Sequence, residues 1–246
     1  MDPVDESGKL WAYTPATSAW SVLEPAPAPS GAPIPAPPAR SYHALTSDGA
    51  STLFLHAGCP AKGRLSDLWS FDIQARVWTE LAAAPPPARG GTSLAYLAGK
   101  IYRMGGFDGK SEQGGSVDVY DIATNTWESI AFSTGRDGPE ARSVAALVPV
   151  KVHGRDYLVT MFGERDPSSL GHEGAGKMLR DVWAFDVETK TWARLEPGSG
   201  TEIPAARGWF GADVVRSNNG PDGVVVHGGL AEDNSRLGDV WKLTLS

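Results

Sequence analysis

The chain has 246 residues, 41% of them hydrophobic and 21% charged, which is the balance of an ordinary globular protein. Its formal net charge of −7 disfavours non-specific binding to nucleic acid or to an anionic membrane, and no apolar run is long enough to span a bilayer. Because a single cysteine (Cys59) excludes an internal disulfide and the first residues lack the pattern of a secretory signal, we expect an intracellular protein, cytoplasmic or nuclear, that is not secreted.

Two short strands are predicted at the start of the chain, in the segments LWAYT and AWSVL within residues 9–23. A proline-rich stretch, residues 24–38, follows them. Its composition is typical of an extended, polyproline-like loop inside a domain and not of a boundary between domains. We therefore expect residues 9–23 to belong to the same domain as the rest of the chain.

From residue 39 onward the chain repeats. Four segments begin with alanine, arginine and a small residue, and their arginines lie 49, 53 and 65 residues apart. These starts are Ala39-Arg40-Ser41, Ala88-Arg89-Gly90, Ala141-Arg142-Ser143 and Ala206-Arg207-Gly208. Each start leads into a small or apolar strand, and a second strand then ends in glycine: STLFLHAG, KIYRMGG, YLVTMFG and GVVVHGG.

A third strand with an aromatic residue and a fourth strand with a tryptophan complete the first three repeats. The two aromatic residues are always seven positions apart, and the segment 9–23 has the same spacing. The pairs are Tyr13 and Trp20, Phe71 and Trp78, Tyr120 and Trp127, and Phe185 and Trp192. The last repeat ends after its third strand, DVWKL. The predicted repeats span residues 40–81, 89–130, 142–195 and 207–245.

A period near 50 residues with a double glycine and a spaced aromatic pair is typical of kelch repeats, which form the blades of a β-propeller. The predicted fold class is therefore all-β: a kelch-type β-propeller in a single domain, residues 1–246, with each repeat as one blade and residues 9–23 as a half blade. The pattern gives seventeen strands, against about 24 in six four-stranded blades. We expect about four and a half blades of six, with the N-terminal part of the propeller truncated.

The four repeated arginines are candidate ligand-binding residues. In an antiparallel blade the loop from strand two to strand three lies at the end where strand one begins, so Arg40, Arg89, Arg142 and Arg207 share one mouth of the channel with those loops. A ring of guanidiniums suits an anionic ligand such as sulfate, phosphate or carboxylate. The alternative is that each arginine clamps backbone carbonyls or an acidic neighbour between blades.

The third repeat carries the longest loop between its second and third strands, residues 163–181. There Glu164 takes the place of the second glycine, His172 follows eight residues later, and Asp166 and Ser168 lie between them. Oxygen ligands and an imidazole at the mouth would suit Fe(II), which makes all four residues candidate metal ligands and makes Glu164 and His172 candidate catalytic residues. A loop held by its own hydrogen bonds is the alternative.

Several segments of the chain resemble the nitrile-specifier-like group of kelch proteins. They are GERDPSSLGHEGAGKM, RSYHALTSDG, AGCPAKGRLSDLW, ARGGTSLAYLAGKIY, ARGWFGA and VVHGGLAEDNSRLGDVW. The resemblance runs through nearly the whole chain from Gly8. It implies a propeller that uses iron to divert unstable glucosinolate aglycones, released by myrosinase, to nitriles, epithionitriles or thiocyanates.

The iron motif proposed for that group, E-x-x-x-D-x-x-x-H, matches this chain at Glu164 and His172, but Ser168 stands at the position of the Asp. A hydroxyl is a poorer ligand for Fe(II) than a carboxylate, so we expect a weaker iron site here. The resemblance also implies that Arg40 faces the substrate sulfate and that Trp209 lies near the pocket.

Two functions remain open on the sequence. The first is Fe(II)-assisted conversion or binding of an anionic, sulfur-containing small molecule, which needs Glu164 and His172 to face each other across a polar pocket. The second is a non-enzymatic scaffold whose mouth loops grip a protein partner, which needs an exposed apolar or charged patch. A copper radical oxidase is disfavoured because no histidine cluster surrounds Cys59, and no G-x-S-x-G, P-loop or G-x-G-x-x-G motif occurs.

Overall fold

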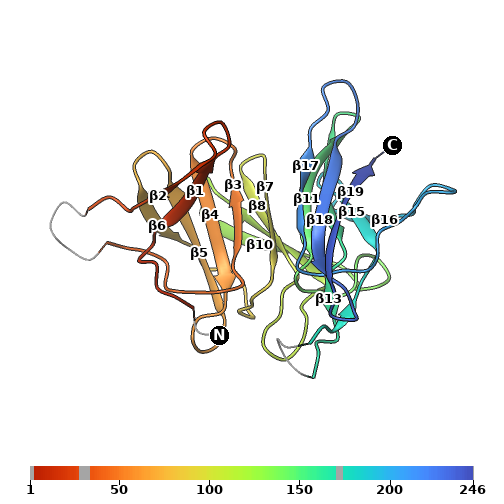
Figure 1. The fold of residues 1–246 in the computed structure, drawn as a ribbon, viewed down its shortest axis with the longest axis horizontal. Helices are drawn as coiled ribbons and strands as arrows, with labels where there is room; N and C mark the ends of the chain where they lie inside the picture. Colours follow the sequence, from red (N-terminus) through yellow and green to blue (C-terminus); the bar gives the residue numbers. More distant parts are fainter. Residues whose placement is uncertain (1–2, 28–33, 170–173, 246) are drawn as a thin grey trace.

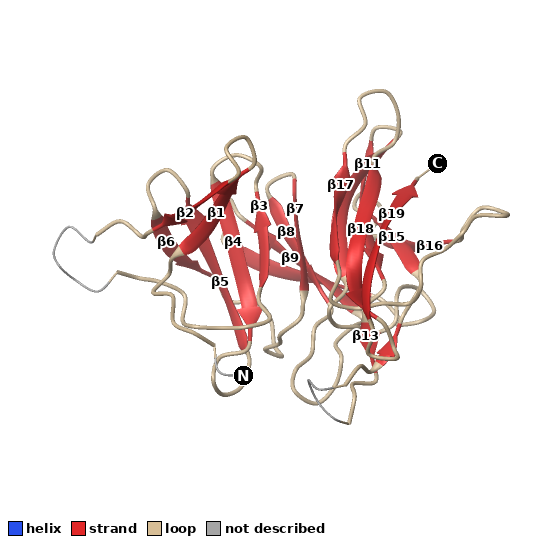
Figure 2. Ribbon diagram, viewed as in Figure 1, coloured by secondary structure: helices blue, strands red, loops and turns tan. Residues whose placement is uncertain are grey.

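The computed structural model describes residues 3–27, 34–169 and 174–245, which contain strands, turns and loops and no helix (Figure 2). The strands form separate antiparallel sheets in which neighbours in sequence are neighbours in the sheet, apart from one inserted hairpin. The sheets stand side by side in an arc as blades of a propeller, with the N-terminal hairpin and the last sheet on opposite sides (Figure 1). The predicted all-β propeller class is confirmed.

The N-terminal hairpin consists of β1 (Leu10–Thr14) and β2 (Ala19–Leu23). The first blade contains β3 (Ala44–Ser47), β4 (Thr52–Gly58), β5 (Leu65–Asp72) and β6 (Val77–Leu81). The second contains β7 (Ser93–Leu97), β8 (Lys100–Met104), β9 (Ser116–Asp121) and β10 (Thr126–Ala131).

The third blade contains β11 (Ala146–Val152), β12 (Arg155–Met161), β15 (Val182–Asp186) and β16 (Thr191–Leu195). The hairpin β13 (Glu164–Arg165) and β14 (Lys177–Met178) is inserted between β12 and β15. The last sheet contains β17 (Gly211–Val215), β18 (Gly223–Leu230) and β19 (Arg236–Thr244). The first strands of successive blades, β3, β7, β11 and β17, lie next to one another around the central hollow.

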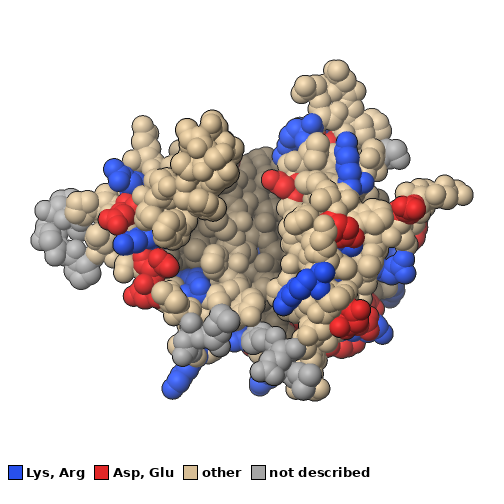
Figure 3. Space-filling model, viewed as in Figure 1, with Lys and Arg blue, Asp and Glu red and all other residues tan. Residues whose placement is uncertain are grey.

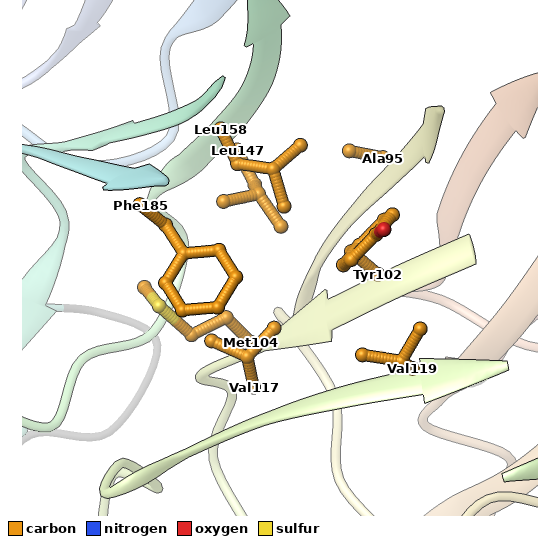
Figure 4. Close-up of a cluster of buried hydrophobic side chains, with 8 residues drawn as sticks. All are labelled: Ala95, Tyr102, Met104, Val117, Val119, Leu147, Leu158 and Phe185. Atoms are coloured by element: carbon orange, nitrogen blue, oxygen red, sulfur yellow. The ribbon is translucent and has the colours of Figure 1, made fainter. Parts of the chain in front are cut away.

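The hydrophobic core lies between blades and not within them. Figure 4 shows one such interface, where β7, β8 and β9 of the second blade face β11, β12 and β15 of the third. Its buried side chains are Ala95, Tyr102, Met104, Val117, Val119, Leu147, Leu158 and Phe185. Because a single sheet buries its face only against the next sheet, each blade stabilises its neighbours.

The seven-residue aromatic spacing places each pair directly opposite across strands three and four. Phe71 pairs with Trp78 and Tyr120 with Trp127 in the sheet register, and their ring centroids are 4.8 and 5.2 Å apart. The indole of Trp127 also donates a hydrogen bond to the carbonyl of Ala82 in the preceding blade (2.8 Å). The pairs therefore stabilise both their own blade and its contact with the neighbour.

A buried arginine at the start of a blade links three strands through one guanidinium. Arg142, with a side chain 1% exposed, donates through Nη1 and Nη2 to the two carboxylate oxygens of Asp181 (2.9 Å each). It also donates through Nε to the carbonyl of Glu140 and through Nη1 to the carbonyl of Phe162, both at 3.0 Å. The Trp183 indole donates to the same aspartate (2.6 Å). The guanidinium thus ties the start of strand one to the end of strand two and the start of strand three.

The first and last blades repeat this arrangement. Arg40 binds Asp67 through two hydrogen bonds of 2.6 Å, and Arg207 binds Asp239 through hydrogen bonds of 2.6 and 2.9 Å. Although burial opposes ionisation of Asp181, hydrogen bonds from Arg142 and Trp183 lower the pKa of its carboxyl below the ordinary value. Asp181 is therefore ionised at neutral pH and neutralises Arg142.

We call the arrangement of a buried arginine, its two carbonyl acceptors and its aspartate the arginine clamp. This clamp predicts a large loss of stability when its aspartate carboxylate is removed. Asp181→Asn leaves the buried Arg142 without a counter-charge, and we expect the free energy of unfolding to fall by about 3–5 kcal/mol. Asp137→Asn is the control, because it removes a carboxylate from an ion pair whose Arg136 side chain is 79% exposed, and we expect little change. Denaturant melts of the two variants that coincide would contradict the clamp.

Close backbone contact between blades predicts a second difference in stability. Gly105 has a φ of +68°, and a Cβ there would collide with the carbonyl oxygen of Arg142 in the next blade. Gly99 in the same blade has a φ of +78°, but a Cβ there meets no other atom within 4 Å. Both alanine variants should lose about 1–2 kcal/mol from the left-handed conformation, and Gly105→Ala should lose about 1–3 kcal/mol more from the collision. Equal losses in thermal unfolding would show that the blades do not approach closely at Gly105.

Candidate ligand site at the channel mouth

A cavity of about 330 Å³ lies at the mouth where the strand-one starts meet the loops between strands two and three. A deep hollow opens between the blades, and its walls are mostly uncharged in the view of Figure 3. The cavity is lined by residues from several blades, and seven of them occupy two equivalent positions of the repeat. The first position is Tyr42, Gly91, Val144 and Trp209, and the second is Cys59, Phe107 and Glu164.

The first position lies two residues after each blade-start arginine and forms a backbone collar. The N–H of Gly91 donates to the carbonyl of Tyr42 (2.9 Å), that of Val144 to Gly91 (2.8 Å), and that of Trp209 to Val144 (3.1 Å). All four residues have positive φ values, between +47° and +61°. Three of them carry side chains that rarely adopt this conformation, and such strain persists where the surrounding structure fixes it. The collar therefore fixes the side chains of Tyr42, Val144 and Trp209 at the cavity.

The second position immediately follows the last glycine of strand two. Its members form single antiparallel bridges with the residue after each arginine: Ser41 with Cys59, Gly90 with Phe107, Ser143 with Glu164 and Gly208 with Leu230. The prediction that Glu164 replaces the second glycine is therefore wrong. Phe162 and Gly163, with φ values of +57° and +98°, occupy the two glycine positions, because the N–H of Gly163 must reach the carbonyl of Arg207 in the next blade. Glu164 is the charged member of a set that is otherwise Cys, Phe and Leu.

Glu164 is a buried carboxylate, 6% exposed, held by the hairpin β13–β14. The backbone N–H of Gly176 donates to its Oε1 (2.5 Å). Burial raises the pKa of Glu164 against the effect of this hydrogen bond, and the carboxylate of Glu112 raises it further. The loop is thus held partly by its own hydrogen bonds, as one alternative from the sequence has it, and it presents an acidic group to the cavity.

A second carboxylate, Glu112, lines the same cavity. It is placed by a bridge with Phe107, and its Oε1 is buried without a hydrogen-bond partner among the described residues. Burial raises the pKa of Glu112, and the charge of Asp166 raises it further. Two desolvated carboxylates at one cavity repel each other unless a proton or a cation lies between them.

A cationic side chain, Arg64, stands at another part of the wall. Its guanidinium carbon lies 5.9 Å from the ring centroid of Phe107, and Nη1 donates to the carbonyl of Gly63 (2.8 Å). Its Nε is buried and makes no hydrogen bond within the described part of the chain. Burial raises the pKa of the neighbouring Cys59 thiol, although the charge of Arg64 opposes this shift. The cavity thus combines an apolar wall, one guanidinium and two carboxylates.

The four predicted arginines do not line this cavity. Arg40, Arg142 and Arg207 are bound to aspartates, and the buried Arg89 donates to the carbonyls of Pro87 and Gly105. The predicted ring of guanidiniums facing an anionic ligand is therefore not formed at this cavity, because three of these groups are paired with aspartates and Arg89 points to backbone carbonyls. The structure uses the arginines as clamps, which is the alternative that the sequence left open.

The predicted metal ligands are placed differently from one another. Ser168 lines the cavity with Glu164, whereas the Asp166 side chain is 76% exposed and lies near Arg165 (3.7 Å). His172 lies outside the described residues. Among the residues that are described, no group of three or more His, Cys, Asp and Glu side chains is arranged to hold a metal ion. Trp209, which the resemblance places near the pocket, lines this cavity.

Sequence reasoning missed Glu112, Arg64 and Tyr42. Glu112 and Arg64 lie in the loops between strands two and three of the first two blades, and Tyr42 is the repeat equivalent of Trp209. Alignment of the four repeats on their arginines would have found Tyr42. The loops differ in length and composition, so no pattern marks Glu112 or Arg64.

Of the part of the chain that is described, no helix is long and apolar enough to cross a membrane.

Comparison with known proteins agrees with this architecture. The family described as the KLHDC2/KLHL20/DRC7 Kelch-repeats domain matches residues 2–219. The N-(sulfonatooxy)prop-2-enimidothioate sulfolyase of Thlaspi arvense is 28% identical over 83% of this chain and 62% of its own length. Human Kelch domain-containing protein 10 is 25% identical over 85% of this chain and 45% of its own length, and human Host cell factor 2 is 26% identical over 97% and 30%.

The chain therefore spans less than two thirds of the length of each of these relatives. The resemblance to the nitrile-specifier-like group noted in the sequence agrees with the similarity to the sulfolyase. The family match covers most of the chain, and the sheets have the order and spacing of propeller blades. The protein belongs to the KLHDC2/KLHL20/DRC7 kelch-repeat domain family.

Proposed function

We propose that the mouth cavity binds a small anionic, sulfur-containing molecule of the glucosinolate-aglycone type, and that Fe(II) held at Glu164 assists its conversion. The observation that carries the proposal is the presence, in one cavity, of a guanidinium (Arg64), a buried carboxylate (Glu164) and a half-buried one (Glu112). The name of the Thlaspi arvense relative describes a sulfolyase of a sulfonatooxy imidothioate, which is an anionic, sulfur-containing molecule. A cavity of about 330 Å³ is within the usual range for small-molecule sites.

Arg64 would bind the anionic end of the ligand. Its buried Nε has no acceptor among the described residues, so an anion there would receive a charge-assisted hydrogen bond. The ring of Phe107 lies beside this guanidinium and would exclude water from the bound anion. These residues would hold the sulfate group at one side of the cavity while the rest of the molecule faces the carboxylates.

The proposed Fe(II) would lie at the other side of the cavity, where two described carboxylates and a hydroxyl would be its protein ligands. Glu164 and Glu112 would supply carboxylate oxygens, and the Oε1 of Glu112, which has no hydrogen-bond partner among the described residues, is the kind of buried acceptor that a cation satisfies. Ser168 supplies a hydroxyl, and the imidazole would come from His172, as the family resemblance implies. Asp166 does not fit, because its carboxylate is exposed and lies toward Arg165. A bound Fe(II) would supply Lewis acidity toward an oxygen or sulfur of the ligand.

The metal part of the proposal is tested by titrating anaerobically prepared protein with Fe(II). We expect binding that Glu164→Gln weakens at least tenfold and that Ser168→Asp tightens by about tenfold to hundredfold, since one added charged contact contributes about 1.5–3 kcal/mol. Glu80→Gln, an exposed position on β6, is the control and should bind as the unchanged protein does. If neither the unchanged protein nor Ser168→Asp binds iron, the metal is removed from the proposal.

The anion part is tested separately, with inorganic sulfate and a stable sulfate ester as probes. Arg64→Gln should weaken binding of the ester by about tenfold to hundredfold, and Arg64→Lys should restore part of it. Arg136→Gln is the control, because this arginine is largely exposed and lies in no described cavity. Equal affinities of all variants, measured by calorimetry, would show that Arg64 does not bind the ligand.

A protein scaffold is the second candidate, and it is favoured by a specific surface. Tyr13 and Trp20 pair across the hairpin β1–β2, as do Trp11 and Val22, so the four side chains share one face of the hairpin. Trp11 and Trp20 are 62% and 65% exposed. An exposed aromatic patch of this kind is typical of a surface that contacts another protein. A partner bound here would be lost in Trp20→Ser and retained in Arg64→Gln.

A further inference from the structure

The second blade breaks the arginine clamp. Strand β9 pairs with β10 in the register that β5 and β6 use, and Ser116, four residues before Tyr120, stands where Asp67 stands four residues before Phe71. The blade that begins with Arg89 therefore has a hydroxyl at the position from which the other three blades supply a carboxylate. The side chain of Ser116 is also shorter, since it lacks the carboxyl group.

Arg89 is nevertheless as buried as the arginines that have a carboxylate. It is 5% exposed and donates through Nε to the carbonyl of Pro87 and through Nη1 to that of Gly105, at 3.1 Å each. Arg142 makes the two equivalent bonds and adds two to Asp181. Within the described residues no carboxylate accepts a hydrogen bond from Arg89. Its Nη2, which in Arg142 binds the aspartate, therefore lacks an acidic acceptor.

The nearby charges do not neutralise Arg89. Arg103, fully buried on β8, takes the carboxylate of Asp118 through hydrogen bonds of 3.0 and 2.6 Å. His56, also fully buried, is neutral at physiological pH, because burial and the charge of Arg103 lower its pKa to about 3. Asp108 contributes some attraction, but it lies at the surface and binds the backbone N–H groups of Lys110 and Ser111. Two buried guanidiniums thus share one buried carboxylate.

The arginine cannot relieve this imbalance by losing its proton. Burial and the charge of Arg103 lower the pKa of Arg89 to about 10, which leaves it protonated at neutral pH. A buried, uncompensated charge is strongly unfavourable, and the usual remedy is a paired opposite charge. A counter-ion from solution can take the place of an absent side-chain carboxylate when the guanidinium fork is already held in position.

We propose that Arg89 binds a small monovalent anion, chloride or a free carboxylate such as formate, beside Ser116, where the other blades place an aspartate. The three sibling clamps define the geometry, because their guanidiniums make the same two carbonyl contacts and present Nη1 and Nη2 to the aspartate. This site is separate from the mouth cavity, which Arg89 and Ser116 do not line. The proposal stands whether or not the cavity binds the ligand suggested above.

The experiment is thermal unfolding of the full chain in sodium chloride, sodium formate and sodium gluconate at equal ionic strength, with gluconate as the anion too large for the site. We expect chloride or formate to raise the melting temperature by about 3–5 °C for each tenfold increase in concentration above the dissociation constant. Ser116→Asp supplies the carboxylate within the chain, so it should melt higher in gluconate and lose the response to small anions. Chloride and formate are separate arms, and their relative effect identifies the preferred anion.

Three further variants make the result decisive. Ser116→Asn adds similar volume without charge and should not reproduce the stabilisation by Ser116→Asp. Arg89→Met removes the cation and should abolish the response to small anions. Asp181→Ser reproduces the second blade's arrangement in the third blade, so it should lower the melting temperature and add a second response to small anions. If the unchanged protein melts identically in all three salts, or if Ser116→Asp keeps the full response, the proposed site is wrong.

Discussion

The buried guanidinium at the start of each blade is the interaction on which the rest of the structure depends. It holds the start of strand one against the end of strand two and, in three blades, against the aspartate that begins strand three. The residues after it must then turn sharply into the blade, and the carbonyl of the arginine itself accepts a hydrogen bond from the preceding blade's glycine, as Arg142 does from Gly106 (2.8 Å). One arginine thus fixes the blade through its side chain and the contact with the blade before it through its backbone carbonyl.

The candidate site follows from this constraint. Since every blade presents its backbone to the mouth in the same way, chemistry at the mouth depends on which side chains occupy the equivalent positions. At the position after the strand-two glycine the blades present Cys59, Phe107, Glu164 and Leu230, and two residues after the arginine they present Tyr42, Gly91, Val144 and Trp209. A repeating scaffold with one charged member at such a position becomes asymmetric, which a specific small-molecule site requires.

The fold could be predicted from the sequence because its signals are local and repeated. The seven-residue aromatic spacing corresponds to directly opposed residues of strands three and four, as Phe71 and Trp78 show. The residues of the candidate site were harder to predict from the sequence. Sequence spacing placed Glu164 on a glycine position, whereas the interblade hydrogen bond of Gly163 fixes it one residue later. No local sequence feature distinguishes an arginine that binds a ligand from Arg142, which binds Asp181 some forty residues away. Glu112 is recognised as a candidate only in the folded structure, where its charge acts on Glu164.

The second blade shows how the clamp and the site are connected. Gly90 and Gly91, which line the cavity, directly follow Arg89, and Gly91 continues the collar. Gly91 adopts its φ of +61° without the strain that Val144 and Trp209 carry, and it presents no side chain to the cavity. The second blade is also the blade whose arginine lacks a side-chain carboxylate among the described residues. The position of Gly90 and Gly91 at the cavity therefore depends on the hydrogen bonds that hold Arg89 to backbone carbonyls and on the group that neutralises its charge. A change in the charge balance around Arg89 would accordingly change the shape of the cavity at the channel mouth.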